Sequence, residues 1–409
     1  MTTANDPIPD ADGELPLTGI IVIDLTHIYN GPYATFLMAM AGATVIKIEP
    51  RNGEHLRHRA EAASAGVPFA MLNLNKRAVT LDFTKERGRE LLLQMIERAD
   101  VVAENFAPGV LDRRGLGYEA ARSVNPSIIY ASGSGYGLSG PNRDYPAMDL
   151  TVQAMSGVLA TTGEAGQAPV KAGPALADFS GGVHLYGAIA TALFQRERTG
   201  RGRKLEVSMQ EATYASLSSS IGMYFFRPDD GPPQRTGNRH SGMAESPYNL
   251  YPTRDGHIAI VGNHDRHFRQ ILELMGREDL VDDPRFLGLR ARARHMDDVD
   301  ELVGSWTAQF DKEPLASLLL ERRVPCAPVR EIPEVVRDKH MHERGALVWQ
   351  DHPQLGRIVV QRSPMRYHGT PLTPLTPSAQ LGEHNHEIYG DWLGLDDVEL
   401  RALIREEVV

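Results

Sequence analysis

The chain has 409 residues, 42% of them hydrophobic and 23% charged, a composition typical of a globular protein with room for two or three domains. The formal net charge of -10 argues against a nucleic-acid partner, because phosphate binding needs a dense basic surface. The single cysteine, Cys326, excludes an intrachain disulfide and indicates a reducing, cytoplasmic setting.

The first residues of the chain predict a surface tail rather than a targeting segment. Residues 1–18 are acidic and rich in proline, and they lack the basic and apolar stretches of a signal peptide. No run of about 18 apolar residues occurs further along, so no membrane span and no membrane partner are expected.

From Gly19 onward, short β-branched runs alternate with helical patterns. Strands are predicted near 19–26, 43–49, 100–105 and 127–137, and helices near 31–42, 84–100 and 117–127. This rhythm is typical of βαβ units around a mostly parallel sheet. We therefore expect an α/β fold that binds its ligands at the carboxyl ends of the strands.

The pattern changes after residue 212. A helix-like run at 210–226 leads into a polar stretch rich in proline and glycine at 227–238, which marks a domain boundary. The turn at 254–256 between two strand-like runs predicts a hairpin. Residues 333–409 contain few long elements and are expected to wrap over another surface.

The glycine-rich stretch from Gly135 to Gly140 matches the spacing G-x-G-x-x-G after a predicted strand. Pro141 and Pro146 follow where a dinucleotide-binding fold would open a helix. The sequence therefore favours a loop that closes over a ligand, or a plain surface connection, over a site for NAD.

No metal site is expected, although histidines pair at short spacing in polar, loop-rich surroundings. These pairs are His55/His58, His264/His267, His340/His342 and His384/His386. Cys326, in the stretch VPCAP, is interpreted as a small packed residue and not as a nucleophile.

One carboxylate, Asp178, stands in the stretch ALADFSGG ahead of a long apolar run. Two interpretations stay open: Asp178 caps the helix that follows, or it is a nucleophile toward an activated acyl group. In the second case Gly181 and Gly182 let a substrate approach the backbone closely. Amides at the helix start would then stabilise an oxyanion or a thiolate.

Ten segments of the chain, in order, resemble the family III CoA-transferases of the CaiB/BaiF type, which include formyl-CoA transferase and carnitine CoA-transferase. They run from about Gly19 to the end and include DLTHIYNGPYAT, GATVIKIEPRNGE, LNLNKRAVTLD, ALADFSGG and LGEH. The resemblance implies a large domain with a Rossmann-like sheet and a small α+β domain. Two linkers close the chain into a ring, and two rings interlock in a homodimer.

On this resemblance, the domains have the following expected limits. The ranges are 1–18 for the tail, 19–212 for the first part of the large CoA-binding domain, 213–236 for the linker, 237–332 for the small domain and 333–409 for a C-terminal segment that returns to the large domain.

The resemblance also implies the chemistry. The aspartate of the family matches Asp178, whose carboxylate attacks the donor thioester to give a mixed anhydride and then an aspartyl-CoA thioester. The acceptor carboxylate takes CoA by the same steps in reverse. Coenzyme A and acyl-CoA are substrates, no permanently bound cofactor or metal is implied, and small acids such as succinate are the preferred substrates.

Further site residues are carried over by position from the family. The thioester end would be lined by His27, Tyr29, Asn30 and Gly31. The CoA arm would be lined by Leu81, Asn105, Phe106, Arg113, Ser134 and Tyr136. The acceptor acid would contact Arg239, His240 and Asn263 of the small domain. Asn30 departs from the alanine of many members and adds a polar group near the acyl part.

Two other functions stay open as alternatives. The α-methylacyl-CoA racemases share this fold, but they carry a histidine directly before the aspartate of the segment that matches PAMDL. Here Met148 precedes Asp149, and methionine cannot shuttle a proton. The other alternative is a CoA-binding protein without catalysis, against which the intact ALADFSGG segment speaks.

Overall fold

The computed structural model describes residues 14–58, 66–226 and 235–409. Residues 1–13 of the predicted tail and 227–234 of the predicted linker lie outside the described residues. The chain divides into two compact units, which we treat separately. The large unit comprises Met1–Val152, Ala175–Thr213 and Asp338–Val409, and the small unit comprises Gln153–Pro174 and Tyr214–Arg337. Gln153–Pro174 thus belongs to the small unit although it precedes the predicted boundary.

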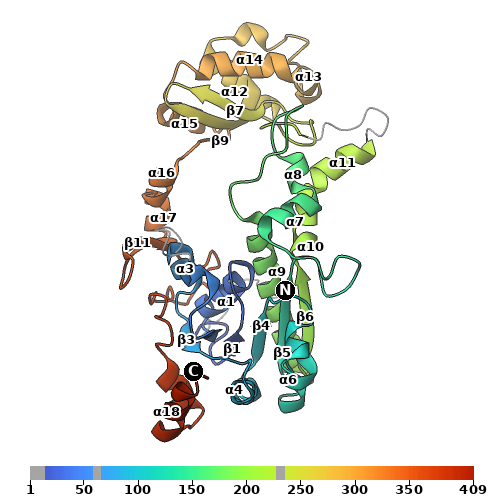
Figure 1. Cartoon of the computed structure of the whole chain (residues 1–409). Coiled ribbons are helices and arrows are strands. Elements are labelled where there is room, and N and C mark those ends of the chain that lie inside the picture. The colour runs from blue at the N-terminus through green and yellow to red at the C-terminus, as the bar shows by residue number, and fades with distance from the viewer. Residues whose placement is uncertain (1–13, 59–65, 227–234) are drawn as a thin grey trace, which may run out of the picture. The chain divides into compact units, whose positions relative to one another are not determined.

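Six strands form the sheet of the large unit, in the order β3-β2-β1-β4-β5-β6 (Figure 1). All neighbouring pairs are parallel, which confirms the predicted α/β sheet. The chain moves outward from β1 in one direction and from β4 in the other, so the carboxyl ends of β1 and β4 flank a topological switch point. The strands are β1 (Ile21–Asp24), β2 (Thr44–Glu49), β3 (Arg77–Thr80), β4 (Val101–Glu104), β5 (Ile129–Ser134) and β6 (Arg203–Ser208).

Helices cover both faces of this sheet because successive strand residues point to opposite sides. Val22 and Val101 belong to a core with α1 and α9. Ile23 and Val102 belong to the core on the other face, with α4 and α6. The four helices are α1 (Asn30–Met40), α9 (Leu176–Thr199), α4 (Glu86–Glu97) and α6 (Tyr118–Val124).

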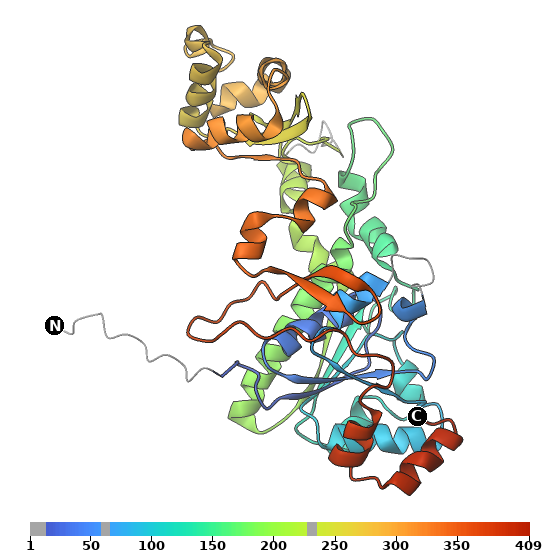
Figure 2. The same ribbon diagram turned by 90° about the vertical axis from the view of Figure 1, so that its left-hand side faces the viewer.

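The C-terminal part of the large unit begins at Asp338. Its strands β10 (Leu347–His352) and β11 (Gly356–Gln361) pair with each other in antiparallel fashion. The π-helix η4 (His386–Trp392) and α18 (Asp397–Arg405) contribute Tyr389 and Leu403 to the core around α4. Figure 2 shows this C-terminal segment, in red, beside α4.

The small unit contains an antiparallel sheet packed with helices around a separate core. The predicted hairpin at 254–256 is confirmed, because β7 (Tyr248–Thr253) and β8 (Gly256–Val261) pair across it. β9 (Cys326–Pro328) adds a third strand. The helices that pack with this sheet are α12 (Asp265–Met275), α14 (Met296–Thr307) and α15 (Lys312–Glu321).

Short elements complete the described chain. They are α2 (His55–His58), α3 (Gly66–Leu72), α5 (Val110–Arg113), α7 (Asp149–Ser156), α8 (Val158–Thr161), α10 (Met209–Tyr214), η2 (Ala215–Leu217), α11 (Ser218–Phe226), η3 (Glu278–Leu280), α13 (Leu289–Arg294), α16 (Ile332–Val336) and α17 (Lys339–Glu343). The glycine-rich stretch 135–140 opens no helix, since α7 begins only at Asp149, as the prolines of this loop predicted.

The start of α9 packs tightly against the start of α1. A Cβ atom at Gly181 would lie 2.2 Å from Asn30 Nδ2, and one at Gly182 would lie 2.6 Å from the Asn30 carbonyl oxygen. Both distances are too short for a side chain at either glycine. The glycines that follow Asp178 are therefore required by helix packing, which also fixes the position of Asp178 on the large unit.

We expect Gly182→Ala to lower the free energy of unfolding by about 1–3 kcal/mol, because an added methyl group forces the two backbones apart. Gly187→Ala on the same helix is the control, since a Cβ atom there meets nothing within 4 Å. This control is expected to gain about 0.5–1 kcal/mol, because alanine favours the helix. Urea unfolding measures both effects, and equal stability of the two variants would contradict the tight contact.

Candidate active site

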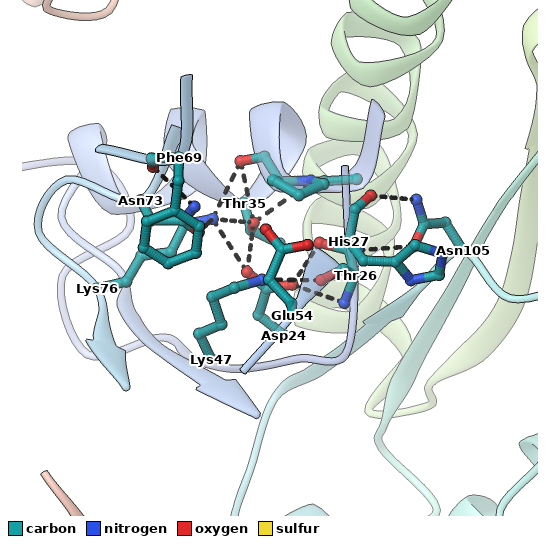
Figure 3. A network of polar contacts seen from close by, with 12 residues as sticks. Asp24, Thr26, His27, Thr35, Lys47, Glu54, Phe69, Asn73, Lys76 and Asn105 are labelled. Atoms are coloured by element: carbon teal, nitrogen blue, oxygen red, sulfur yellow. Dashed lines mark hydrogen bonds and ion pairs between the residues drawn. The ribbon is translucent and has the colours of Figure 1, made fainter. Parts of the chain in front are cut away.

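The switch point of the sheet is closed by a reciprocal pair of hydrogen bonds. The amide N–H of His27, after β1, donates to Asn105 Oδ1, after β4, at 2.9 Å. Asn105 Nδ2 donates back to the His27 carbonyl oxygen, also at 2.9 Å (Figure 3). These two bonds tie together the carboxyl ends of β1 and β4, the parallel strands on either side of the switch point, and they fix the backbone of His27.

The residue after His27 has an unusual backbone. Ile28 has a φ of 67°, in the left-handed region that a β-branched residue rarely adopts. Its amide N–H faces Glu54 Oε2 at 3.5 Å. Strained residues of this kind gather at functional sites, where the surrounding contacts hold them in place.

A cavity of about 350 Å³ lies beside this turn. Its lining comes from the ends of β1, β4 and β5, from the loop 135–148 and from the start of α9. Seven of the predicted site residues line it: His27, Asn30, Asn105, Phe106, Ser134, Tyr136 and Asp178. The structure therefore brings together predicted residues from four separate segments of the chain.

A second, larger cavity of about 860 Å³ shares His27 and Phe106 with the first. Its other lining residues follow β1, β2 and β3, and they include the predicted Leu81 as well as Arg51. The His27 and Phe106 rings lie 5.2 Å apart between centroids. These two side chains thus form a common wall between the cavities.

Three of the residues predicted to bind CoA line neither cavity. The Tyr29 ring stacks on Phe179, with centroids 6.0 Å apart. Gly31 is buried so closely against Thr26 that a Cβ atom would lie 2.3 Å from it. Arg113 is exposed to solvent. Their roles in CoA binding stay predictions.

Asp178 is the third residue of α9, whose N-cap is Ala175. The interpretation of Asp178 as the helix cap is wrong, because another residue caps this helix. Asp149 Oδ1 accepts hydrogen bonds from the amides of Ala177 at 2.9 Å and of Asp178 at 3.4 Å. The Asp178 carboxylate itself accepts no hydrogen bond from any described residue.

The same contact corrects a second expectation. The Ala177 and Asp178 amides already donate to Asp149, so they are not available to an oxyanion or a thiolate. The sequence singles out Asp149 only in the racemase alternative, as the aspartate of PAMDL. No local pattern predicts that it accepts hydrogen bonds from the start of α9.

The environment of Asp178 makes its carboxylate strongly basic. Asp178 is buried, with only 7% of the residue exposed to solvent. Burial, followed by the negative charge of Asp149, raises the pKa of Asp178 from 3.8 to about 7. A carboxylate with this pKa is a far better nucleophile or proton acceptor than an exposed one, and such shifts gather at catalytic sites.

Asn30 links the α1 turn to this carboxylate. It is 4% exposed, and its Nδ2 donates to the backbone carbonyl of Asp178 at 3.2 Å. Its Oδ1 is buried and has no hydrogen-bond partner among the described residues. A buried acceptor without a hydrogen bond destabilises the folded state. This acceptor belongs to a residue that lines the cavity of Asp178.

The predicted acceptor residues lie in the small unit. Arg239 is held there by two acids, with Asp297 and Asp300 each 2.7 Å from Nη2. His240 Nδ1 accepts a hydrogen bond from the Gly242 amide at 3.2 Å, and Asn263 is half-buried. To bind a substrate carboxylate, Arg239 would have to release one of its partners, and the role of all three residues stays a prediction.

Other classes of site have little support in the described residues. Among residues 14–58, 66–226 and 235–409, no group of three or more His, Cys, Asp or Glu residues is placed to hold a metal ion. No helix in these ranges is long and apolar enough to cross a membrane. Burial raises the pKa of the Cys326 thiol to about 11, which makes it a poor nucleophile.

With this geometry established, comparisons with known proteins agree with one another. The sequence model of CoA-transferase family III matches residues 17–385. Formyl-CoA:oxalate CoA-transferase from Streptomyces avermitilis is 35% identical over 409 residues, covering 96% of this chain and 99% of that protein. Succinate–glutarate CoA-transferase from Agrobacterium fabrum is 33% identical over 397 residues, covering 95% and 97%. The crystal structure of a CaiB/BaiF family protein from Brucella suis matches with a TM-score of 0.81 at 31% identity, covering 92% and 99%.

We expect Asp178→Asn to stabilise the protein at pH 8. A carboxyl with a pKa of about 7 in the folded state and 3.8 in the unfolded state binds its proton more tightly when folded. Its contribution to stability therefore falls as the pH rises from about 4 to 7. The full cost above pH 7 is about 4 kcal/mol, at 1.36 kcal/mol per pKa unit.

Thermal unfolding of the wild type and the variant between pH 4.5 and 8 would measure this effect, over roughly the interval set by the two pKa values. The gain from Asp178→Asn should grow with pH and level off above about 7. Asp391→Asn, at an exposed position of the large unit, is the control and should give no such trend. A pH-independent effect of Asp178→Asn would contradict the raised pKa.

Proposed function

Since the chain belongs to CoA-transferase family III and is a CoA-transferase, we propose that it moves CoA from an acyl-CoA to a small carboxylic acid with Asp178 as the covalent nucleophile. One observation carries this proposal. Asp178 lies in a cavity at the switch point of the sheet, without a hydrogen-bond donor among the described residues, and with a pKa raised to about 7.

The chemistry begins with the Asp178 carboxylate, which attacks the carbonyl carbon of the donor thioester. The new C–O bond forms as the C–S bond breaks, giving a mixed anhydride and CoA thiolate. The thiolate then attacks the aspartyl carbonyl of the anhydride. This second step leaves an aspartyl-CoA thioester and releases the donor acid as its carboxylate.

The acceptor half of the reaction repeats these steps. The acceptor carboxylate attacks the aspartyl-CoA thioester and expels CoA thiolate, which gives a second mixed anhydride. The thiolate attacks the acyl carbonyl of the acceptor part, so that acyl-CoA forms and the Asp178 carboxylate is restored. Charge and atoms balance in every step, and the reaction needs no oxidant and no ATP.

The two cavities suggest a path for CoA. The larger cavity, with Arg51 at its wall, has space for the nucleotide and a guanidinium for a phosphate group. The pantetheine arm would pass His27 and Phe106, which line both cavities, and bring its thioester to Asp178. Burial, followed by the charge of Lys47, lowers the pKa of His27 to about 4, so that a neutral imidazole would face this arm at pH 7.

Small acids are the proposed substrates. The two relatives described above are named for small substrates. One name contains formyl-CoA and oxalate, and the other contains succinate and glutarate. The cavity around Asp178, at about 350 Å³, suits short acyl groups better than long chains. Racemisation finds no support at this cavity, because Met148 in its lining has no group to transfer a proton.

The interlocked homodimer, with two linkers closing each chain into a ring, and a cytoplasmic location are also part of the proposal. The exposed apolar side chains of α9 support a partner that covers this helix. Val183 is 49% exposed and Phe194 is 62% exposed. Surfaces of this kind are common where another subunit binds.

Transfer assays with a matrix of donors and acceptors test the proposed function. Formyl-CoA, acetyl-CoA and succinyl-CoA would each be mixed with oxalate, succinate and glutarate, and the products separated by chromatography. We expect transfer with at least one pair. Its kcat/KM should rise with pH through about 7, because only the ionised Asp178 attacks.

Two variants sharpen this assay. Asp178→Asn keeps the shape of the side chain but lacks the nucleophile, so it should lose essentially all transfer while it still binds CoA. Asp391→Asn, at an exposed position of the large unit, should transfer CoA at the wild-type rate. Transfer by Asp178→Asn at the wild-type rate would refute the covalent role of Asp178.

A further inference from the structure

A cluster of charged and polar side chains is buried beneath the turn that carries His27 and Asn30 (Figure 3). None of its members is more than 4% exposed. We call it the Asp24 network, and it consists of Asp24, Thr26, Thr35, Lys47, Asn73 and Lys76. It comes from the ends of β1 and β2, from α1 and from the residues around the start of β3.

Asp24, the last residue of β1, binds both sides of the turn. Its Oδ1 accepts hydrogen bonds from the amide and the hydroxyl of Thr26. Its Oδ2 accepts from the hydroxyl of Thr35 in α1, at 2.8 Å. One carboxylate thus connects the strand to the first turn residues and to the helix beyond the turn.

Lys76, the residue before β3, holds the same region from the far side of β2. Its Nζ lies 3.0 Å from Asp24 Oδ2, 2.8 Å from Thr35 Oγ1 and 3.1 Å from the Pro32 carbonyl oxygen. It also lies 3.0 Å from Asn73 Oδ1. The ammonium group therefore connects β1, the first turn of α1 and the segment that leads into β3.

Lys47 holds the turn itself. Its Nζ donates to the carbonyl oxygen of Thr26 at 2.8 Å, and Thr26 directly precedes His27. On the other side, Glu54 Oε2 faces the amide of the left-handed Ile28. The backbone on both sides of His27 is thus bound to a buried charge.

Stability alone does not account for this arrangement. Removing two lysines and an aspartate from water is costly, and apolar residues of similar volume often stabilise a fold as well or better. What the charges specify is a geometry, because their bonds fix Thr26 before the turn and Pro32 and Thr35 after it. The outer side of that turn lines the cavity of Asp178.

We propose that the Asp24 network positions the reacting groups: Lys47 and Lys76 hold the turn so that His27 and Asn30 keep their places around Asp178 and the bound thioester. The inference rests on the proposed function. The electrostatics of His27 agree with the proposal. Burial, followed by the charge of Lys47, lowers the pKa of this imidazole. The charge of Asp24 raises the same pKa, and His55 lowers it.

The double variant Asp24→Asn/Lys76→Met tests this proposal. It removes both partners of the Asp24–Lys76 ion pair together, and Lys47 keeps its hydrogen bond to the Thr26 carbonyl oxygen, so the fold should survive. We expect CoA binding, measured by calorimetry, to stay close to the wild type. We expect kcat to fall about tenfold to a hundredfold, because a displacement of about 1 Å in a reacting group is enough for such a loss.

A control removes another ion pair of the large unit, which is partly buried. Arg196 Nη1 pairs with Asp100 Oδ1 at 2.8 Å, and Asp100 precedes β4 at the opposite end of the strand from Asn105. Asp100→Asn/Arg196→Met should change the unfolding midpoint but not kcat. If both double variants lose kcat equally, or neither does, the positioning proposal is overturned.

Thr35→Val is the milder variant, since it removes one hydroxyl of the network and no charge. It decides the question if Asp24→Asn/Lys76→Met does not fold, and a kcat equal to that of the wild type would then overturn the proposal. If the wild type transfers no CoA between any tested pair, the proposed function fails separately. The NMR signal of the His27 imidazole then decides, because the proposal requires it to shift in the network variants and not in the control.

Discussion

The reciprocal hydrogen bonds between His27 and Asn105 are the interaction on which the rest of the site depends. They join β1 and β4, the two neighbouring strands from which the chain moves outward in opposite directions. Such a switch point opens a crevice at the carboxyl edge of a parallel sheet. His27 lines both cavities of the site. The turn after His27 leads into α1, and the start of α9, which carries Asp178, packs against the start of α1.

Two opposite electrostatic designs lie on either side of this turn. Beneath it, the charges of Asp24 and Lys76 are paired 3.0 Å apart and hold the backbone in place. Burial by itself would raise the pKa of Asp24. The positive charges of Lys76 and Lys47, with hydrogen bonds from Thr26 and Thr35, outweigh burial and lower this pKa to about 2. Above it, Asp178 is buried near another acid, Asp149, and burial followed by this negative charge raises the pKa of Asp178 to about 7. The fold thus concentrates its stabilising contacts on the scaffold and leaves the carboxylate basic.

The sheet was predictable because short β-branched runs and amphipathic helices have distinct periods that can be read from local sequence. That ligands bind at the carboxyl ends of the strands was also predictable, since parallel strands bring these ends to one edge. The individual residues His27, Asn105 and Ser134 came from the family resemblance. The capping of α9 was not. Its acceptor, Asp149, lies 28 residues before Ala177, and no local pattern connects the two. The ion pair between Lys76 and Asp24 was not predictable for the same reason, because these residues are 52 positions apart. The exposure of Arg113 could not be predicted either, because it depends on how α5 packs.

The most direct test of the account is to look for the covalent intermediate on Asp178. The protein would be mixed with an acyl-CoA, treated with borohydride and digested, and the peptide that contains residue 178 would be weighed. Borohydride reduces an aspartyl-CoA thioester to the alcohol, which converts this aspartate to homoserine. We predict homoserine at position 178 with at least one donor, and none in Asp178→Asn. An unmodified Asp178 peptide, under conditions in which the enzyme transfers CoA, would contradict the account.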